Sequence, residues 1–581
     1  MLAELLERAR ADKPLWLPDL REVFLRDESA RPVILRLTLL DGTQRDYSCA
    51  LPRWENEEER RLVYEFLYAV LYNLLAACSG RELRLFFDTG DAELCALYDS
   101  LDTVFQLSGT KRRGYGKVIS IAGRIAHRLG GPAFRFARTD LRDYAPLPAP
   151  VPAPAPAPLD AKLRALCKKA GGLRLCGVDV GGTDIKLALS DGERLVCTKE
   201  FDWNPAAYET AEEITEPILL LTRLMRCCLA AEGGACPEAD RAALHAALDK
   251  AAPLSVMREA VEAAEAYFGS GIRALDGVGL SFPDIVIDDR ILGGETPKTY
   301  GMRRNEALDY EAAFAKLSGL KDALLSLCRS GGRVHITNDG NMAAFTAGVE
   351  IAHSKDAQML RDGVIAHSLG TGLGTGWLQA DGTIPALPLE MYDLILDLGS
   401  FRSCAFAPDD LRSTRNENSG LPGARRYMGQ AAAYRLAQKL DPSLLDGFTE
   451  YADDLLCIRT APEDLRKPCL EHLMREAEAG NPAACEVFRS IGGNLAVVSR
   501  EMEYLLHPAP QARYLFGRFV KRPAVFALLD EGFRAGVAGL RLIPSDEGLA
   551  NTPLMRALAG MPDVTVAQFG QAVGSIYFAL T

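Results

Sequence analysis

Two glycine-rich segments have the composition of phosphate-binding loops. In the first, GVDVGGTDIK at residues 177–186, an apolar run reaches Asp179 and then turns through Gly181, Gly182 and Thr183. Glycine lets backbone N–H groups come close to a phosphate, and the Thr183 hydroxyl adds a donor. Asp179 could hold Mg²⁺ through water, since hard cations prefer oxygen ligands. A plain β-hairpin with a glycine turn is the alternative.

The second segment, SLGTGLGTG, occupies residues 368–376 and follows the apolar run VIAH. Glycines at every second position make a poor strand and a good phosphate cradle. A strand and turn pattern follows at 377–382, where a dinucleotide-binding Rossmann unit would need a helix. A hairpin without a ligand again remains an alternative. Together, the two segments predict two similar lobes that hold one nucleotide from either side.

Asp339 lies between these segments, in VHITNDGN at residues 334–341. The pattern predicts a strand that ends at Asn338 and a helix that follows, so Asp339 lies at a strand end, where α/β sheets gather their ligands. As a general base, it would accept the proton of a substrate hydroxyl during phosphoryl transfer. As a helix cap, it would need no chemistry, and the residue types alone favour the cap.

Three segments taken in chain order, GVDVGGTDIK, TNDGNMAAF and SLGTGLGTG, resemble the ROK family (repressors, open reading frames and kinases) and the wider hexokinase group. They match the phosphate-1, catalytic-aspartate and phosphate-2 segments, and the resemblance covers about residues 173–581. It implies two ribonuclease-H-like lobes, an ATP–Mg²⁺ cleft between them and transfer of the γ-phosphoryl group to a sugar hydroxyl. We therefore expect an ATP-dependent carbohydrate kinase of the sugar kinase, hexokinase and actin-like ATPase superfamily.

The resemblance also implies roles for single residues. Asp339 takes the catalytic-base position and Asn338 a sugar-contacting position. The residues expected to contact the ATP phosphates are Gly181, Gly182, Thr183, Lys186, Gly370, Thr371, Gly372 and Gly374.

Weaker matches extend this set. Ser281 in SFP and Lys298 in TPKT resemble sugar-binding stretches of hexokinases, with a proline inside the usual Thr–Lys pair. Glu390 in LPLEMYD takes roughly the place of a sugar-contacting glutamate, without the glycine and histidine that normally follow it. The adenosine segment is reduced to YLFGRF around Gly517, and the family's zinc cysteines are missing from residues 415–429, so no zinc site is expected.

The elements that must position these residues indicate an α/β fold. After a Pro/Ala-rich linker at 145–160, strands and helices alternate to the end of the chain, with two helical insertions. The resemblance implies that this part forms two kinase lobes, at 161–340 and 341–581, each with one of the insertions. The linker reads as a stiff polyproline spacer. It separates an N-terminal α+β module, residues 1–144, whose role the residues do not show. We expect a chain that begins near Asp160 to fold without this module.

Composition excludes several function classes. The 581 residues carry 66 Lys and Arg against 78 Asp and Glu, a net charge of −12, which favours neither nucleic acid nor anionic lipid. No apolar run approaches the roughly 20 residues of a membrane span, and the N-terminus lacks a signal-peptide pattern, so a cytoplasmic protein is expected. The 14 cysteines form no CxxC pair and are expected to be reduced thiols. A sugar is the expected small-molecule partner, and homo-oligomer formation is left open.

Two rivals to a kinase remain. Some ROK proteins are sugar-responsive repressors with an N-terminal winged helix, but residues 1–144 lack a compact, basic three-helix pattern. The other rival is a catalytically quiet sensor of the ROK type that binds sugar or nucleotide. The reduced adenosine segment favours it, whereas Asp339 and both glycine loops favour an enzyme.

Overall fold

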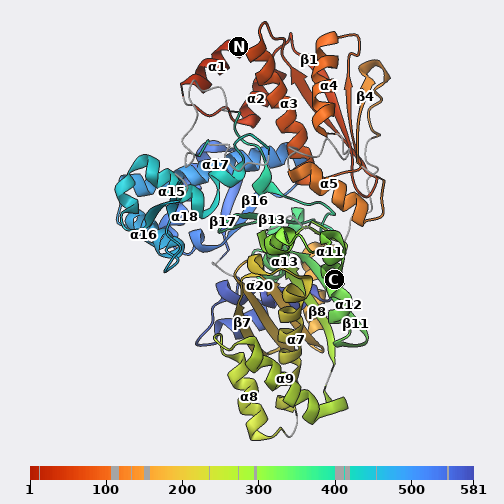
Figure 1. Cartoon of the computed structure of the whole chain (residues 1–581), viewed down its shortest axis with the longest axis vertical. Coiled ribbons are helices and arrows are strands. Elements are labelled where there is room, and N and C mark those ends of the chain that lie inside the picture. The colour runs from red at the N-terminus through yellow and green to blue at the C-terminus, as the bar shows by residue number, and fades with distance from the viewer. Residues whose placement is uncertain are drawn as a thin grey trace. The chain divides into compact units, whose positions relative to one another are not determined.

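The structure of the protein is a computed structural model of residues 1–581 (Figure 1). The residues described are 1–11, 13–105, 117–132, 134–148, 157–233, 236–272, 274–293, 297–398, 411–412, 419–452, 455–545 and 549–581. They form two compact units. Unit 1 comprises Met1–Pro152, Ser368–Thr375 and Ala386–Ile543, and unit 2 comprises Ala153–His367, Gly376–Pro385 and Pro544–Thr581.

A five-stranded sheet forms the centre of unit 2, in the order β11-β8-β5-β6-β7. Its strands are β5 (Arg174–Val180), β6 (Asp184–Asp191), β7 (Arg194–Asp202), β8 (Leu275–Phe282) and β11 (Cys328–Asn338). The first three pair antiparallel, whereas β8 runs parallel to both β5 and β11. This order and these directions are those of a ribonuclease-H-like lobe, so the predicted α/β fold class is confirmed.

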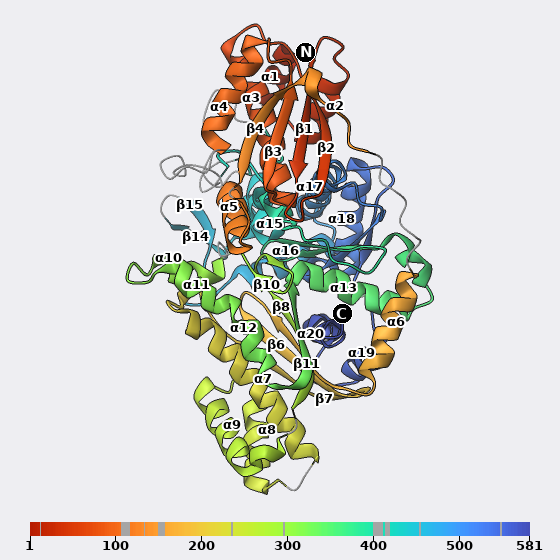
Figure 2. The ribbon, with the colours of Figure 1, turned by 90° about the vertical axis from the view of Figure 1, so that its right-hand side faces the viewer.

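The helix α20 (Val566–Phe578) contacts β5, β6 and β8 of this sheet (Figure 2). Two glycines that are register partners, Gly177 on β5 and Gly279 on β8, make this close approach possible. A Cβ at Gly177 would lie 1.9 Å from the carbonyl oxygen of Ala572, and one at Gly279 would lie 1.8 Å from that of Ser575. Side chains at these positions would therefore drive the helix off the sheet.

The predicted helical insertion in unit 2 is present between β7 and β8, as α7 (Ala211–Gly233), α8 (Glu238–Leu248) and α9 (Leu254–Phe268). The other elements of this unit are α6 (Leu159–Ala170), β9 (Val286–Ile287), β10 (Arg290–Ile291), η4 (Pro297–Thr299), α10 (Tyr300–Arg304), α11 (Tyr310–Ser318), α12 (Leu320–Leu325), α13 (Asp339–Ala352), η5 (Ala357–Asp362) and α19 (Pro553–Ala559).

A second sheet has the order β13-β12-β16-β17. Its strands are β12 (Val364–Leu369), β13 (Leu373–Leu378), β16 (Ala512–Phe516) and β17 (Arg541–Pro544). The predicted second helical insertion lies between β13 and β16. Its elements are η6 (Met391–Asp393), α14 (Ala424–Tyr427), α15 (Gly429–Leu440), η7 (Pro442–Leu445), β14 (Thr449–Ala452), β15 (Leu455–Ile458), α16 (Arg466–Glu478) and α17 (Pro482–Leu506), with η8 (Arg518–Val520) and α18 (Pro523–Gly536) after β16.

The N-terminal residues are α+β, as predicted, with a sheet of order β2-β1-β3-β4 (Figure 2). Its strands are β1 (Arg31–Thr38), β2 (Gln44–Leu51), β3 (Glu82–Phe87) and β4 (Arg135–Asp140), with the predicted hairpin between β1 and β2. The helices are α1 (Leu2–Arg10), α2 (Leu17–Leu25), α3 (Glu57–Cys78), α4 (Ala92–Phe105), α5 (Lys117–Arg128) and η1 (Leu141–Asp143).

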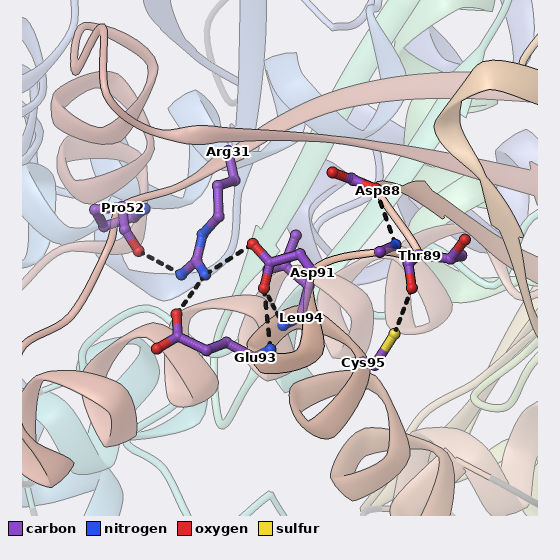
Figure 3. Close-up of polar contacts among 9 residues, drawn as sticks. Arg31, Pro52, Asp88, Thr89, Asp91, Glu93, Leu94 and Cys95 are labelled. Atoms are coloured by element: carbon purple, nitrogen blue, oxygen red, sulfur yellow. Dashed lines mark hydrogen bonds and ion pairs between the residues drawn. The ribbon is translucent and has the colours of Figure 1, made fainter.

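Polar contacts order the start of α4 (Figure 3). The Asp91 carboxylate accepts the backbone N–H groups of Glu93, at 3.0 Å, and Leu94, at 3.1 Å. Arg31, from β1, donates to Glu93 at 2.7 Å and to the Pro52 carbonyl at 3.0 Å. The side chain of Arg31 thus ties β1 to the start of α4.

The packing of residues 1–144 differs from the separate module predicted from the linker. These residues share compact unit 1 with residues 386–543, and buried polar contacts join the two stretches. Arg21 donates to Glu501 at 2.6 Å with both side chains buried, and the Tyr47 hydroxyl donates to the Leu505 carbonyl at 2.9 Å. The Glu501 carboxylate and the Leu505 carbonyl of helix α17 therefore find their hydrogen-bond donors among the N-terminal residues. Residues 149–156 of the linker lie outside the described residues.

Among the described helices, α3 alone has the length and apolar composition of a membrane-crossing helix. Most of its side chains are buried inside the fold.

Candidate functional site

Three neighbouring parallel strands bring polar residues together at one edge of the unit 2 sheet. Asp179 on β5 is the register partner of Ser281 on β8, and Ser281 is the partner of Thr337 on β11. The chain continues from Thr337 into Asn338 and Asp339. The carboxyl ends of parallel strands are the usual ligand-binding edge of an α/β sheet. Residues predicted from segments far apart in sequence are therefore neighbours here.

Asn338, and not Asp339, is the N-cap of α13. Its Oδ1 accepts the Gly340 N–H at 2.8 Å, and its Nδ2 donates to the Asp284 carbonyl at 2.9 Å. Asp339, the first residue of the helix, also accepts the Gly340 N–H through Oδ1, at 2.9 Å. Asn338, rather than Asp339, is therefore the residue that caps the helix. Its side chain, which was predicted to contact sugar, instead makes two hydrogen bonds within the protein.

Asp179 has an unusual titration for a carboxylic acid. Burial raises its pKa to about 6, against the opposing positive charge of Lys186, and the negative charges of Asp184 and Asp339 raise it further. A carboxylate in such surroundings gains from a cation that neutralises it. Asp179 is therefore suited to hold Mg²⁺ through water.

The first glycine turn joins β5 to β6 as a hairpin, as predicted. The Gly181 N–H donates to the Asp184 carbonyl at 2.7 Å, while Trp203 donates from Nε1 to the Gly181 carbonyl at 3.1 Å and from its backbone to Thr183 at 3.0 Å. These bonds hold the turn from both sides. Lys186, a predicted phosphate contact, forms an ion pair with Asp184.

Lys298 lies beside this turn. A Cβ at Gly182 would be 3.4 Å from the Cε of Lys298, which is an ordinary van der Waals contact. The turn and η4 are thus close together, and a cation lies next to the glycine that was predicted to face phosphate. Thr296, the other half of the predicted sugar-binding pair, lies outside the described residues.

The second glycine turn, Gly370 to Gly372, joins β12 to β13 and is held within unit 1. Gly370 donates to the Gly372 carbonyl at 3.0 Å, and the Gln430 N–H donates to the Gly370 carbonyl at 2.9 Å. Gly517 has a φ of +109°, and a Cβ there would lie 2.1 Å from the Leu369 carbonyl oxygen. Gly517, predicted to belong to an adenosine segment, therefore lies against the strand that leads into the turn.

The strand that leaves this turn ends beside the start of α13. A Cβ at Gly376 would lie 1.9 Å from the Gly340 carbonyl oxygen, and the Trp377 N–H donates to Oδ1 of Asn341 at 3.1 Å. Gly374 lies in β13 between the turn and this contact. Within unit 2, the start of α13 thus lies close to Gly376 and forms a side-chain hydrogen bond with the backbone of Trp377.

The predicted site residues divide between the two units. Unit 2 contains Asp179, Gly181, Gly182, Thr183, Lys186, Ser281, Lys298, Asn338 and Asp339, and unit 1 contains Gly370, Thr371, Gly372, Gly374, Glu390 and Gly517. The backbone N–H of Glu390 donates to the Ala76 carbonyl at 3.1 Å. Within the described residues, no group of three or more His, Cys, Asp and Glu side chains could hold a metal ion.

Sequence reasoning missed several residues that shape the site. Asn341 receives the Trp377 N–H, Asp284 anchors Asn338, and Tyr392 lies against the second turn. Asn341 could have been noticed, because it belongs to the TNDGN segment. Asp284 follows the SFP segment and Tyr392 lies within LPLEMYD, but nothing in either segment indicated a role for these two residues.

No family model matches the sequence, and no curated protein matches it. Several solved structures resemble the chain. A ROK family glucokinase from Streptomyces griseus, in complex with glucose and AMPPNP, is 19% identical with a TM-score of 0.39, and the match covers 70% of this chain and 99% of that one.

Two further structures show the same kind of likeness. A ROK hexokinase from Thermus thermophilus is 16% identical with a TM-score of 0.36, and the match covers 66% of this chain and 98% of that one. A glucokinase from Leishmania braziliensis is 13% identical with a TM-score of 0.37, covering 73% and 98%.

Proposed function

We propose that this protein transfers the γ-phosphoryl group of ATP to a hydroxyl of a sugar or sugar derivative, with Asp339 as general base. The observation that carries the proposal is the position of Asp339, which follows β11 at the sheet edge that also presents Asp179. Because Asn338 serves as the N-cap, the Asp339 carboxylate is not needed to begin the helix.

The donor set fits ATP with Mg²⁺. Mg²⁺ keeps most of its waters and binds through one or two carboxylates together with substrate phosphates, so Asp179 suffices without a cluster of acids. The turn at Gly182 has only the flexible end of Lys298 near it, which leaves its backbone accessible. When bound, Mg²⁺–ATP supplies the phosphoryl group and neutralises the charge that develops on it.

Asp339 would act on the acceptor. As the acceptor oxygen forms its bond to the γ-phosphorus, the O–H bond breaks and its proton passes to the Asp339 carboxylate. The bond between the γ-phosphorus and the β,γ-bridging oxygen breaks, and ADP leaves with its electron pair. A positioned general base of this kind contributes typically about 10²–10⁴-fold.

The test is a measurement of ADP and sugar phosphate formation with purified protein, ATP, Mg²⁺ and a panel of aldohexoses, ketohexoses and N-acetylhexosamines. We expect stoichiometric ADP and sugar phosphate for at least one sugar. ATP binding without phosphorylation of any sugar in the panel would favour the quiet sensor instead. Absence of ATP binding would overturn the kinase, and absence of both ATP binding and sugar binding would overturn the sensor as well.

A further inference from the structure

A short segment of unit 1, residues 389–398, is bonded to the N-terminal residues from one end to the other, and we call it the strap. At its start, the N–H groups of Leu389 and Glu390 donate to the carbonyls of Ala77 and Ala76, each at 3.1 Å. These carbonyls belong to the last turn of α3, where helical carbonyls lack partners within the helix. The free carbonyls at the end of α3 thus accept hydrogen bonds from the N–H groups at the start of the strap.

Asn73 holds the middle of the strap with both ends of its side-chain amide. Its Oδ1 accepts the Ile395 N–H at 2.7 Å, and its Nδ2 donates to the Ile395 carbonyl at 2.9 Å. The side chain is fully buried, and its Nδ2 also donates to Glu501 at 3.0 Å. Loss of this amide would leave buried backbone groups of Ile395 without partners, which is costly.

The far end of the strap pairs with residues 15–17, at the start of α2. The Leu17 N–H donates to the Leu396 carbonyl at 2.9 Å, and the Leu398 N–H donates to the Leu15 carbonyl at 3.0 Å. The Leu15 N–H donates to Oδ1 of Asp397 at 2.8 Å. The strap is therefore hydrogen-bonded along its length to two N-terminal segments, one at the start of α2 and one in α3.

The strap in turn contacts the second glycine turn through Tyr392. The Tyr392 hydroxyl donates to the Thr371 carbonyl at 3.4 Å, and a Cβ at Gly372 would lie 3.2 Å from the Tyr392 ring. The next residue, Asp393, forms an ion pair with Arg425, whose guanidinium lies 5.3 Å from the ring centre of Tyr392. The ring is thus held against the turn from within unit 1.

We propose that the N-terminal residues position the Gly370–Gly372 turn through the strap, with Asn73 and Tyr392 as positioning residues. A glycine turn has little rigidity of its own, so its binding geometry depends on what packs against it. The N-terminal segment thereby contributes to nucleotide binding through the strap. This inference rests on the proposed function of the turn as a phosphate-binding element.

The test is a double-mutant cycle on the affinity for Mg²⁺ and AMPPNP, measured by calorimetry on the full chain. We expect Asn73→Leu and Tyr392→Ala each to weaken binding about tenfold, within the range of residues that act through others. The double variant should be no weaker than the weaker single variant, because residues that act in series do not add. Glu93→Gln is the matched control, since it removes the negative charge that pairs with Arg31 in the same N-terminal segment but away from the strap (Figure 3).

Hydrogen exchange gives a readout that does not depend on nucleotide. In Asn73→Leu, amide exchange should rise at Ile395 and at the Gly370–Gly372 turn, and it should stay at the wild-type rate there in Glu93→Gln. In the wild type, AMPPNP should slow exchange in both the turn and the strap, because coupling between two sites is reciprocal.

The outcomes separate the two proposals. If the wild type binds no AMPPNP, the proposed function fails, and exchange at the turn in Asn73→Leu still tests the positioning role. Unchanged turn exchange in a folded Asn73→Leu protein, or fully additive effects of the two substitutions on affinity, would overturn the positioning role. If Asn73→Leu does not fold, the affinity of Tyr392→Ala and the hydrogen exchange of the wild type with AMPPNP test the positioning role instead. A strap that is not protected when AMPPNP binds would overturn that role.

Discussion

Lys186 lies directly opposite Asp179 in the antiparallel pair of β5 and β6, yet its ion pair is with Asp184. The positive charge of Lys186 is therefore shared between the two carboxylates. Burial has the larger effect on Asp179 and raises its pKa to about 6. A carboxyl group with this pKa changes charge just below neutrality. This makes the proposed Mg²⁺ ligand testable by pH.

We expect the affinity for Mg²⁺–ATP to fall as the pH drops from 7 to 5. Asp179 is ionised above its pKa of about 6 and attracts the cation, whereas below that pH it is protonated and neutral. The loss can reach about tenfold per pH unit for one linked proton. Calorimetric titrations across this range measure it.

The matched control is Asp179→Asn, because phosphate groups themselves titrate with a pKa near 6. The variant should bind Mg²⁺–ATP more weakly at pH 7, and its affinity should follow only the titration of the nucleotide. Identical pH profiles for the variant and the wild type would remove Asp179 from the cation site.

Asp339→Asn should lower sugar phosphorylation by about 10²-fold or more, since a positioned general base contributes on that scale. The fold should persist, because Asn338 provides the N-cap and the substituted amide keeps an oxygen for the Gly340 N–H. Affinity for Mg²⁺–ATP should stay close to that of the wild type. Steady-state kinetics with unchanged kcat would assign Asp339 a purely structural role.

Two glycines of the first segment should respond differently to alanine. Gly182→Ala should leave the melting temperature nearly unchanged, because the new Cβ would lie 3.4 Å from the flexible Cε of Lys298. It should weaken Mg²⁺–ATP binding about tenfold by filling space that the phosphates need. Gly177→Ala should instead destabilise the fold by about 1–3 kcal/mol or more, because its Cβ would lie 1.9 Å from the Ala572 carbonyl oxygen.

Thermal unfolding and calorimetry on both variants distinguish the two roles. Wild-type nucleotide affinity in a folded Gly182→Ala protein would place the phosphates away from this turn.

A chain that begins near Asp160 should fail to fold, contrary to what the proline-rich linker predicts. Loss of the N-terminal residues would expose α17. It would also remove Arg21 and Asn73, the hydrogen-bond partners of the fully buried Glu501. Expression of the shortened chain, followed by circular dichroism and light scattering, measures the outcome. A soluble, cooperatively folded product would show that residues 1–144 are dispensable for folding.

A single substitution measures how much the contact between the N-terminal residues and α17 contributes to the free energy of unfolding. Arg21→Met should cost about 3–5 kcal/mol, the usual effect of removing one partner of a buried ion pair. Arg26→Met, at an exposed pair with Glu22, should cost at most about 1 kcal/mol. Chemical denaturation of both variants gives the comparison, and equal costs would mean that the Arg21 contact contributes little.

Local patterns in the sequence predicted the strand, turn and helix around each chemical residue. The hairpin at Gly181 and Gly182 and the helix that follows Asn338 were predictable because apolar periodicity and glycine turns act over a few residues. The same patterns indicated the α/β class and the two helical insertions. Which residue caps α13 was not predictable, because Asn338 and Asp339 are both good caps and backbone geometry chooses between them.

Only the tertiary structure decided the place of the N-terminal residues. Asn73 and Glu501 are 428 positions apart in the chain, and neither belongs to a motif. A proline-rich linker limits the local conformation of the chain but does not prevent the residues before it from packing against a distant helix. The sequence by itself determined the elements and the residues able to do chemistry. Long-range burial determined their partners, because hydrogen bonds between distant residues become visible only once the chain has folded.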